Sequence, residues 1–219
     1  MPLNQKIFYV EGNIGSGKST FCKWIEDNFY DFIDVVYEPV DEWKKTVDKN
    51  NKNLLDYFYK NPQRWAYTFQ MMALTSRVKS LEKQSYKPIR CIDRSIYCDN
   101  FVFAKNCYET GLFTEIEWKL YKDMYNFINK QFKYKPTFMI YLQTKPETCV
   151  ERIKKRARNE ENSIPLDYLK QIHKKHEDWL FDKQWHVPVI KINENDIDYQ
   201  DEKKMKKLKN KIIELFIKT

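Results

Sequence analysis

Several features that mark membrane or exported proteins are missing from this sequence of 219 residues. No apolar run approaches the roughly 20 residues that are needed to cross a bilayer. The first apolar stretch, Ile7–Val10, is too short for the core of a secretory signal, and no Arg- and Ser-rich transit extension precedes it. We therefore expect a cytosolic (cytoplasmic) protein that does not bind membranes.

Cysteine is scarce and shows no metal-binding spacing. Five cysteines are scattered along the chain, and no two of them form a C-x-x-C pair: Cys22, Cys91, Cys98, Cys107 and Cys149. An odd number without close spacing argues against a disulfide framework and against a metal knuckle. Reduced thiols are expected.

Flexible linkers and internal repeats are also absent. Hydrophobic residues make up 42% of the chain and charged residues 32%, which is typical of a packed core with a solvated surface. A chain of this length accommodates one sizeable core. The sequence therefore predicts a single domain over residues 1–219.

The net charge of +8 has two possible explanations. The simpler explanation is a lysine-rich surface, much of it in the tail after Asp201. The functional explanation is a basic cleft that attracts an anionic ligand. Charge alone does not separate a nucleotide from a nucleic acid, although we expect no nucleic-acid partner.

Short apolar runs alternate with longer helical patterns, which indicates βαβ units and a parallel sheet, hence an α/β fold. The candidate strands are Ile7–Val10, Ile33–Tyr37, Ile89–Ile92, Phe138–Leu142 and Val187–Ile192. Helical patterns cover Thr20–Phe29, 62–83 and Glu115–Phe132, begin again at Pro146 and Pro165, and fill the tail after Asp201. The strands lack polar alternation, as expected when helices cover both faces of a sheet.

A complete phosphate-binding motif, G-x-x-x-x-G-K-[ST], lies between the first strand and the first helix. Its residues, with the one that follows, are Gly12, Asn13, Ile14, Gly15, Ser16, Gly17, Lys18, Ser19 and Thr20. The glycines let backbone N–H groups turn inward around an oxyanion, and the helix N-terminus adds partial positive charge. Lys18 is expected to reach the β- and γ-phosphates of ATP, and the Ser19 hydroxyl to bind Mg²⁺.

Charged residues follow the second and third strands, at the edge where ligands gather in open α/β sheets. Glu38 follows the second strand and could accept a proton from an attacking hydroxyl. The alternative is a solvated glutamate beside Pro39. Asp93 ends the third strand and could hold Mg²⁺, and Arg94 could neutralise charge between donor and acceptor. A surface ion pair is the alternative for that pair.

Arginines recur after the fourth strand, at Arg152, Arg156 and Arg158. A planar guanidinium binds phosphate oxygens bidentately, so this segment, about residues 152–163, is expected to be an arginine-rich lid that closes on phosphates. A solvated charged face is the alternative.

These residues together resemble the deoxynucleoside kinase family, and most closely its deoxycytidine and deoxyguanosine kinase branch. The resemblance covers nearly the whole chain. It is carried by Glu11–Ser19, Glu38-Pro39-Val40 with Trp43, Tyr59, Trp65, Phe69-Gln70, Asp93-Arg94-Ser95, 156–161, Ile164-Pro165-Leu166 with Tyr168, and His176-Glu177 with Trp179-Leu180.

The resemblance implies a P-loop kinase fold with a five-stranded parallel sheet, and a homodimer formed through a helix bundle. It implies that Glu38 is the catalytic base, with Arg94 beside the 5′-oxygen and Lys18, Arg152, Arg156 and Arg158 acting on the phosphates. The implied acceptor site consists of Tyr59 and Glu161 at the sugar 3′-hydroxyl, Gln70 at the base edge, and Trp43 and Phe103 as aromatic walls. Relatives mostly carry Glu-Arg-Ser at Asp93-Arg94-Ser95, so the shorter Asp93 predicts a water between it and Mg²⁺.

Base choice is predicted from three positions, Ala73, Arg77 and Asp99, which resemble the deoxycytidine and purine branch. An Arg77–Asp99 pair would crowd a 5-methyl group and offer donors to a base edge. The expected reaction is therefore transfer of the γ-phosphoryl group of ATP to the 5′-hydroxyl of deoxycytidine, deoxyadenosine or deoxyguanosine ahead of thymidine, a step of nucleotide salvage.

Two other functions fit parts of the pattern. A nucleoside monophosphate kinase of the thymidylate type shares the P-loop and a lid, but Glu38 would repel its phosphorylated acceptor. A P-loop NTPase that acts on nucleic acid is favoured only by the net charge. His173, His176 and Glu177 could suggest a metal site, but their helical setting without another clustered ligand favours a structural or surface role.

Overall fold

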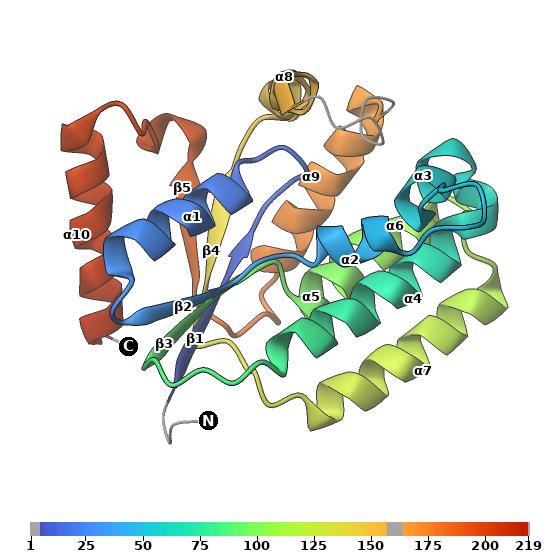
Figure 1. The fold of residues 1–219 in the computed structure, drawn as a ribbon, viewed down its shortest axis with the longest axis horizontal. Coiled ribbons are helices and arrows are strands. Elements are labelled where there is room, and N and C mark those ends of the chain that lie inside the picture. The colour runs from blue at the N-terminus through green and yellow to red at the C-terminus, as the bar shows by residue number, and fades with distance from the viewer. Residues whose placement is uncertain (1–4, 157–163, 219) are drawn as a thin grey trace.

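Five parallel strands form one sheet in the order β2-β3-β1-β4-β5, which confirms the predicted five-stranded parallel sheet. The computed structural model describes residues 5–156 and 164–218 (Figure 1). The strands are β1 (Lys6–Glu11), β2 (Ile33–Val36), β3 (Ile89–Asp93), β4 (Phe138–Gln143) and β5 (Val189–Asn193). The last begins two residues later than predicted, directly after Pro188, which has no backbone N–H to donate.

The central strand β1 is buried on both faces, which explains its unbroken apolar sequence. Phe8 and Val10 point to one side of the sheet and belong to a core with α1 (Lys18–Phe29) and α10 (Glu202–Lys218). Ile7 and Tyr9 point to the other side, into a larger core. Successive side chains of a strand alternate between faces, so one short strand contributes to both cores.

Helices cover both faces of the sheet (Figure 1). The larger core takes residues from α4 (Pro62–Leu81), α7 (Glu115–Gln131) and α9 (Leu166–Leu180). The sixth long helix, α8 (Pro146–Arg156), lies above the ends of the strands. All six long helices in the described part of the chain were predicted, because each carries a sustained helical repeat or begins at a proline. None of the described helices is both long and apolar enough to cross a membrane.

Several short helices were not predicted. They are α2 (Val40–Lys45), α3 (Leu54–Lys60), α5 (Ile96–Cys98), the π-helical turn η1 (Asp99–Ala104), α6 (Lys105–Glu109) and the 3₁₀ turn η3 (Glu194–Asp196). Segments of three to seven residues are too short to show a hydrophobic period. Asn53 caps α3 through its side chain, a local signal that sequence inspection can use.

Helix α7 presents its apolar repeat mainly to solvent. Only Tyr121 and Tyr125 of this helix are buried. Four large apolar side chains on it are exposed: Ile116, Leu120, Met124 and Phe127. The repeat predicted the helix correctly, but most of it lies outside the core of the single chain.

The strand order gathers the charged residues at one edge of the sheet. Strand β3 lies between β1 and β2, with Val10 opposite Asp93 and Val36 opposite Ile92. The segments that follow these three strands therefore leave the sheet side by side, at the carboxyl ends where ligands bind in such folds.

Candidate active site

The loop between β1 and α1 wraps closely around the space where a phosphate would lie. Gly12 has φ +148° and Gly15 has φ +78°, backbone conformations that side chains disfavour. A Cβ atom on Gly12 would lie 2.8 Å from the carbonyl oxygen of Leu142, and one on Gly15 would lie 2.7 Å from that of Cys149. Both glycines are therefore required by space as well as by backbone angle.

Lys18 lies inside this loop rather than in solvent. Its Nζ donates to the carbonyl oxygens of Gly12 and Asn13, at 3.2 and 2.9 Å. Burial and the neighbouring charge of Arg94 lower the pKa of Lys18. The Asn13 side chain donates to the carbonyl of Leu169 on α9 at 2.8 Å, which fixes the loop against that helix.

Ser19 and Asp93 meet at the base of the loop. Ser19 Oγ donates to Asp93 Oδ2 at 2.9 Å. Asp93 is buried, and its other oxygen has no hydrogen-bond partner among the described residues. Burial raises the pKa of Asp93. A hydroxyl beside a carboxylate with a spare oxygen is a donor set that suits Mg²⁺. These two residues therefore fit the predicted metal.

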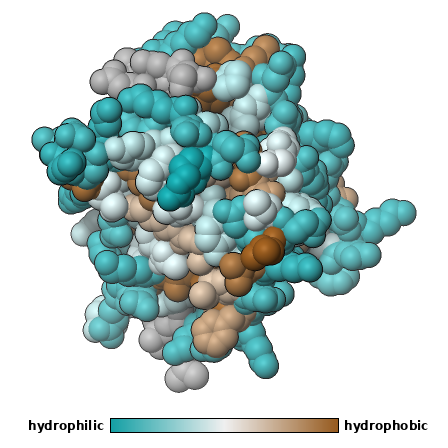
Figure 2. All heavy atoms as spheres, turned by 90° about the vertical axis from the view of Figure 1, so that its right-hand side faces the viewer, coloured by the Kyte–Doolittle hydropathy of each residue, from teal (hydrophilic) through white to brown (hydrophobic). Residues whose placement is uncertain are grey.

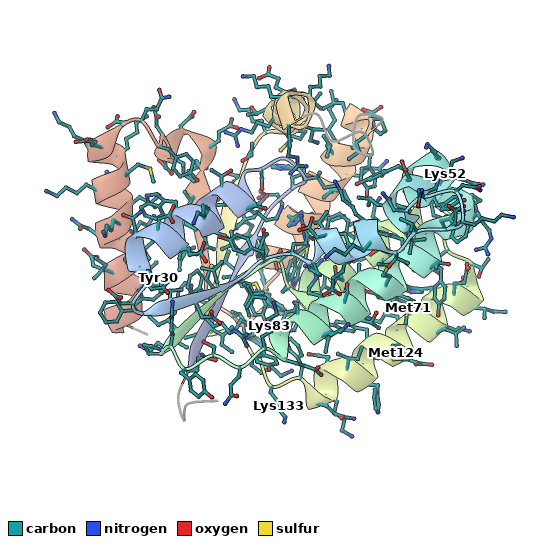
Figure 3. The ribbon with its side chains drawn as sticks, in the orientation of Figure 1. Tyr30, Lys52, Met71, Lys83, Met124 and Lys133 are labelled. Atoms are coloured by element: carbon teal, nitrogen blue, oxygen red, sulfur yellow. The ribbon has the colours of Figure 1, made fainter. Side chains whose placement is uncertain are left out.

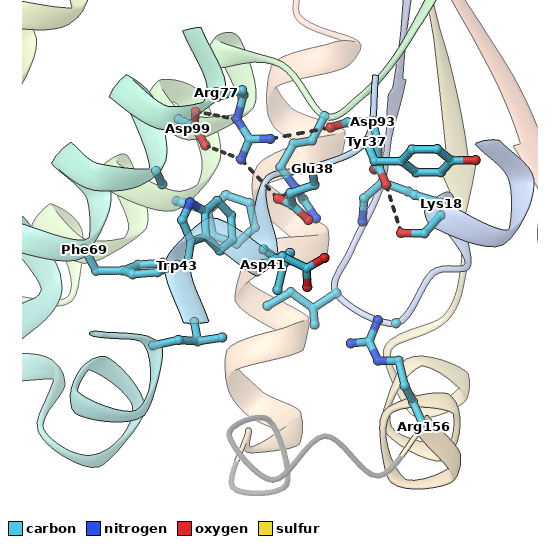
Figure 4. Close-up of a pocket in the computed structure, with 18 of the residues that line it drawn as sticks. Lys18, Tyr37, Glu38, Asp41, Trp43, Phe69, Arg77, Asp93, Asp99 and Arg156 are labelled. Carbon is cyan, nitrogen blue, oxygen red and sulfur yellow. Dashed lines mark hydrogen bonds and ion pairs between the residues drawn. The ribbon is translucent and has the colours of Figure 1, made fainter. Parts of the chain in front are cut away.

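Glu38 is clamped by two arginines. Its Oε1 accepts from Arg77 Nη2 at 3.0 Å (Figure 4). The same oxygen accepts from Arg94 Nε, also at 3.0 Å. Burial alone would raise the pKa of Glu38, but the charges of Arg94, Arg77 and Lys18 outweigh it and lower the pKa to about 2. Glu38 is therefore an ionised acceptor throughout the neutral range, and it faces the phosphate loop.

Arg77 joins Glu38 to a second carboxylate. Its Nε and Nη2 donate to the two oxygens of Asp99 at 2.8 and 3.1 Å, a bidentate pair. Arg77 and Asp99 are each almost fully buried. The predicted pair thus forms, and Arg77 also contacts Glu38, which the sequence did not reveal. The π-helical turn η1 carries Asp99 and Phe103 toward the same space, an example of a π-turn at a candidate site.

A cavity of about 400 Å³ connects these groups (Figure 4). Its walls include almost the whole predicted acceptor site: Glu38, Trp43, Tyr59, Gln70, Ala73, Arg77, Arg94, Asp99 and Phe103. Trp43 packs edge-on against Phe69, with ring centroids 5.4 Å apart. Gln70 is 1% exposed, and its side-chain oxygen has no partner among the described residues, so it is available to a ligand.

Two of the predicted lid arginines, Arg152 and Arg156, face different sides of the phosphate loop. Arg156 lines the acceptor cavity. Arg152 turns to the other side of the loop, where its Nη1 donates to the Ser16 carbonyl at 3.0 Å. Arg158 and Glu161 lie outside the described residues, as does the whole of the predicted lid after Arg156, residues 157–163.

A second cavity of about 620 Å³ lies beyond the loop. Gly17 and Thr20 line both cavities. Its other residues come from the phosphate loop, from α8, and from the ends of β4 and β5 with the segments that follow them: Ser16, Leu142, Thr144, Arg152, Lys155, Ile192, Glu194, Ile197, Asp198, Tyr199 and Gln200. Apart from Ser16 and Arg152 these residues were not predicted, although their position after strand ends was a usable signal.

Other lining residues of the acceptor cavity were also missed. They are Tyr37, Val40, Asp41, Leu55 and Phe69, with Asp41 pointing into the space between Glu38 and Arg156 (Figure 4). Val40 and Phe69 were noted only as part of the family resemblance. Tyr37, Val40 and Asp41 adjoin Glu38 in the chain, so the loop after β2 as a whole was the signal.

The parallel sheet and the glycine-rich loop that opens α1 define a P-loop nucleotide-binding protein. The sequence profile of the family "Deoxynucleoside kinase" matches residues 8–218. The chain belongs to the deoxynucleoside kinase family, and it is an enzyme that phosphorylates deoxynucleosides, with ATP as the phosphate donor of the family.

Three relatives illustrate the similarity. The chain is 39% identical to human deoxycytidine kinase, over 88% of this chain and 84% of the relative. It is 38% identical to a probable deoxycytidine kinase of fowlpox virus, over 88% of this chain and 80% of the relative. It is 33% identical to the mitochondrial deoxyguanosine kinase of Xenopus laevis, over 84% of this chain and 79% of the relative.

Proposed function

We propose that the protein transfers the γ-phosphoryl group of ATP to the 5′-hydroxyl of deoxycytidine, deoxyadenosine or deoxyguanosine in preference to thymidine. The observation that carries this proposal is the position of Glu38. Its carboxylate lies in the wall of the acceptor cavity, between Arg77 and Arg94, and the phosphate loop forms the opposite wall. A neutral hydroxyl suits this place better than a group that already carries a phosphate.

Glu38 would receive the proton of the attacking 5′-hydroxyl. A carboxylate with a pKa of about 2 is a weak base. Phosphoryl transfer tolerates a weak base, because its transition state is loose and the hydroxyl loses its proton late. Arg94 would lie between base and phosphoryl group, where it stabilises the charge that develops there.

The donor would lie across the phosphate loop, with its nucleoside part in the second cavity and its phosphates under Lys18. Arg152 and Arg156 lie on the two sides of the loop, toward the second and the acceptor cavity. This supports different tasks for them, with Arg152 on the donor side and Arg156 over the phosphoryl group in flight. Ser19 and Asp93 would hold Mg²⁺, which neutralises charge on the phosphates when bound.

Base choice would depend on the Arg77–Asp99 pair. The pair is buried, bidentate and adjacent to Ala73 and Gln70 in the cavity wall. A rigid guanidinium leaves little room for the methyl group of thymine, whereas Gln70 both donates and accepts toward an amino and a ring nitrogen. Tyr59, on the same wall, would contact the sugar.

The four deoxynucleosides provide the test of this preference. We expect kcat/KM for deoxycytidine, deoxyadenosine and deoxyguanosine to exceed that for thymidine by more than about tenfold, the discrimination that one crowded methyl group gives. Changing Arg77→Met and Asp99→Ala together should raise the ratio of thymidine to deoxycytidine activity. The ratio is the quantity to compare, because Arg77 also contacts Glu38 and the absolute rates of this variant should fall.

A matched control removes a comparable pair elsewhere. Arg90 is 2% exposed and pairs with Asp34 at 3.2 Å, and neither residue lines the acceptor cavity. The variant Arg90→Met with Asp34→Ala should leave the substrate ratio unchanged. Thymidine as the best substrate of the unmodified enzyme would refute the proposal, and so would a ratio that the Arg77 and Asp99 changes fail to move.

We also propose that two copies of the chain pair through α7. The exposed side chains Ile116, Leu120, Met124 and Phe127 follow helical spacing along α7. Figure 2 shows brown, apolar side chains in the lower half of one face, at the height of α7 in Figure 1. Figure 3 labels Met124 on α7 and Met71 on the neighbouring helix α4. A contiguous apolar face of this kind is typical of a contact between subunits.

Light scattering behind a sizing column tests the pairing. We expect a dimer at micromolar concentration, and a monomer when Leu120→Glu and Phe127→Glu are combined, because two charges would be buried without partners. Ile213→Glu, at an exposed apolar residue of α10, is the control and should remain dimeric. A monomeric unmodified protein would contradict this proposal.

A further inference from the structure

Arg94 is held in an unusual conformation. Its backbone has φ +70°, a left-handed region that residues other than glycine rarely adopt. Its N–H donates to the carbonyl of Val10 at 3.0 Å, which ties this turn to the end of β1. The side chain is only 3% exposed. Such outliers persist where the surroundings fix them firmly, and they are frequent at functional sites.

Three groups surround the Arg94 guanidinium. Glu38 accepts from Nε at 3.0 Å, and the ring of Phe103 lies 4.7 Å from the guanidinium carbon. The sulfur of Cys98 accepts from Nη1 at 3.2 Å. The proposed function requires Glu38 to engage the acceptor hydroxyl during turnover. Cys98 is then the one hydrogen-bond partner of the guanidinium, among those described, that the reaction leaves unchanged.

The hydrogen of the Cys98 thiol has a defined direction. His176 Nδ1 lies 2.8 Å from the carbonyl oxygen of Ile172, and because a carbonyl only accepts, Nδ1 carries the hydrogen. His176 Nε2 is then an acceptor, and it lies 3.4 Å from the Cys98 sulfur. Burial lowers the pKa of His176 and raises that of Cys98, so both groups are neutral. The thiol therefore donates to His176 and leaves its lone pairs to Arg94.

The same neighbourhood has the composition of a metal site. One ligand atom each of Glu11, Cys98 and His176 lies within 4.8 Å of the others. The Arg94 guanidinium, however, donates to the sulfur, and its positive charge opposes a cation there. Glu11 instead accepts from the backbone N–H of Ser95 at 2.9 Å, which fixes the residue after Arg94. The contacts favour a role in holding Arg94.

We propose that Cys98 and His176 are positioning residues that hold Arg94 through a chain of two hydrogen bonds. In this chain the Arg94 guanidinium donates to the Cys98 sulfur, and the Cys98 thiol donates to His176 Nε2. This proposal rests on the proposed function, in which Arg94 stabilises the transferring phosphoryl group. The chain keeps the guanidinium fixed while Glu38 changes partners. Neither Cys98 nor His176 lines the acceptor cavity, so neither contacts the substrate.

Substitutions at Cys98 separate this role from simple packing. Cys98→Ala should lower kcat about ten- to a hundredfold, the effect of a slightly misplaced catalytic group, and change the deoxynucleoside KM less than about threefold. Cys98→Ser should recover most of kcat, because a hydroxyl also donates and accepts. Cys107→Ala is the matched control and should retain kcat, since Cys107 is equally buried, in α6, and is not among the described contacts of the Arg94 side chain.

His176→Phe should resemble Cys98→Ala, and the double variant should lose little more than either single one, because the three residues act in one chain. Equal kcat for Cys98→Ala and Cys107→Ala would overturn the proposal, and so would a Cys98→Ser variant no better than the alanine variant. An unmodified enzyme without kinase activity would instead refute the proposed function itself.

Nitrogen NMR of the unmodified enzyme gives a second test that needs no substitution. The ring of His176 should be in the tautomer with hydrogen on Nδ1 at neutral pH. A ring protonated on Nε2 would reverse the direction of the thiol contact and overturn the proposal.

Discussion

Replacing Lys18 with alanine is expected to reduce phosphoryl transfer below about one thousandth of the unmodified rate, since it removes the cation that we propose to face the β- and γ-phosphates. Lys18 is buried in the phosphate loop and donates to two of its carbonyl oxygens. In the free enzyme it therefore also maintains the shape of the loop. Loss of both functions makes this the largest single effect that we expect.

A radiolabelled-phosphate assay with saturating deoxycytidine measures the loss, and titration with ATP should show weakened binding. Lys6→Ala is the matched control. Lys6 Nζ also donates to a backbone carbonyl, that of Phe216 at 2.8 Å, but it lies at the opposite end of β1. Normal turnover by Lys18→Ala would show that the loop does not bind the transferred phosphate.

Glu38→Gln is expected to lower kcat by about a hundredfold or more, because the amide keeps the shape of the side chain but receives no proton. An amide oxygen still accepts from Arg77 and Arg94, so the clamp on this residue should largely persist. Binding of ATP and deoxynucleoside should therefore change little. We expect the substitution to slow the chemical step itself. The rate measured in a single turnover should therefore fall by the same factor as kcat.

Calorimetric titration with deoxycytidine checks that the Glu38→Gln site still binds. Glu42→Gln, four residues further along on the exposed side of α2, serves as the control and should keep its rate. Near-normal kcat in Glu38→Gln would remove Glu38 as the proton acceptor.

The sequence was sufficient to predict where the glycine-rich loop and the charged residues that follow β2 and β3 lie. A local motif identifies the positions of Lys18 and Ser19, because the loop is one contiguous segment of backbone. Strand ends identify Glu38, Asp93 and Arg94, because parallel strands place their carboxyl ends at one edge.

The contacts among these residues depended on the fold. The clamp of Arg77 and Arg94 on Glu38 joins α4, the loop after β2 and the end of β3. No spacing along the chain encodes such a three-way contact. Likewise, the chain from Arg94 to His176 requires α9 to pack beneath the site, and the helical setting of His176 alone suggested a structural or surface role.

The arginine segment shows where sequence spacing misleads. Arg152 and Arg156 are four residues apart and share one side of α8. Arg152 nevertheless contacts the Ser16 carbonyl while Arg156 lines the acceptor cavity. The N-terminus of α1 lies between their targets, so one helix face serves two cavities. Periodicity predicts which residues share one face of a helix. It does not predict which other part of the protein each residue of that face will contact.

ATP consumption with a deoxynucleoside, a deoxynucleotide or DNA as the sole addition distinguishes the proposed kinase from both rival functions. We expect ADP and a 5′-monophosphate to form in equal amounts with deoxycytidine, deoxyadenosine and deoxyguanosine. Both should form more slowly with thymidine, and neither the deoxynucleotide nor DNA should support turnover. ATP consumption that requires a deoxynucleotide or DNA, and does not occur with any deoxynucleoside, would contradict the proposed function.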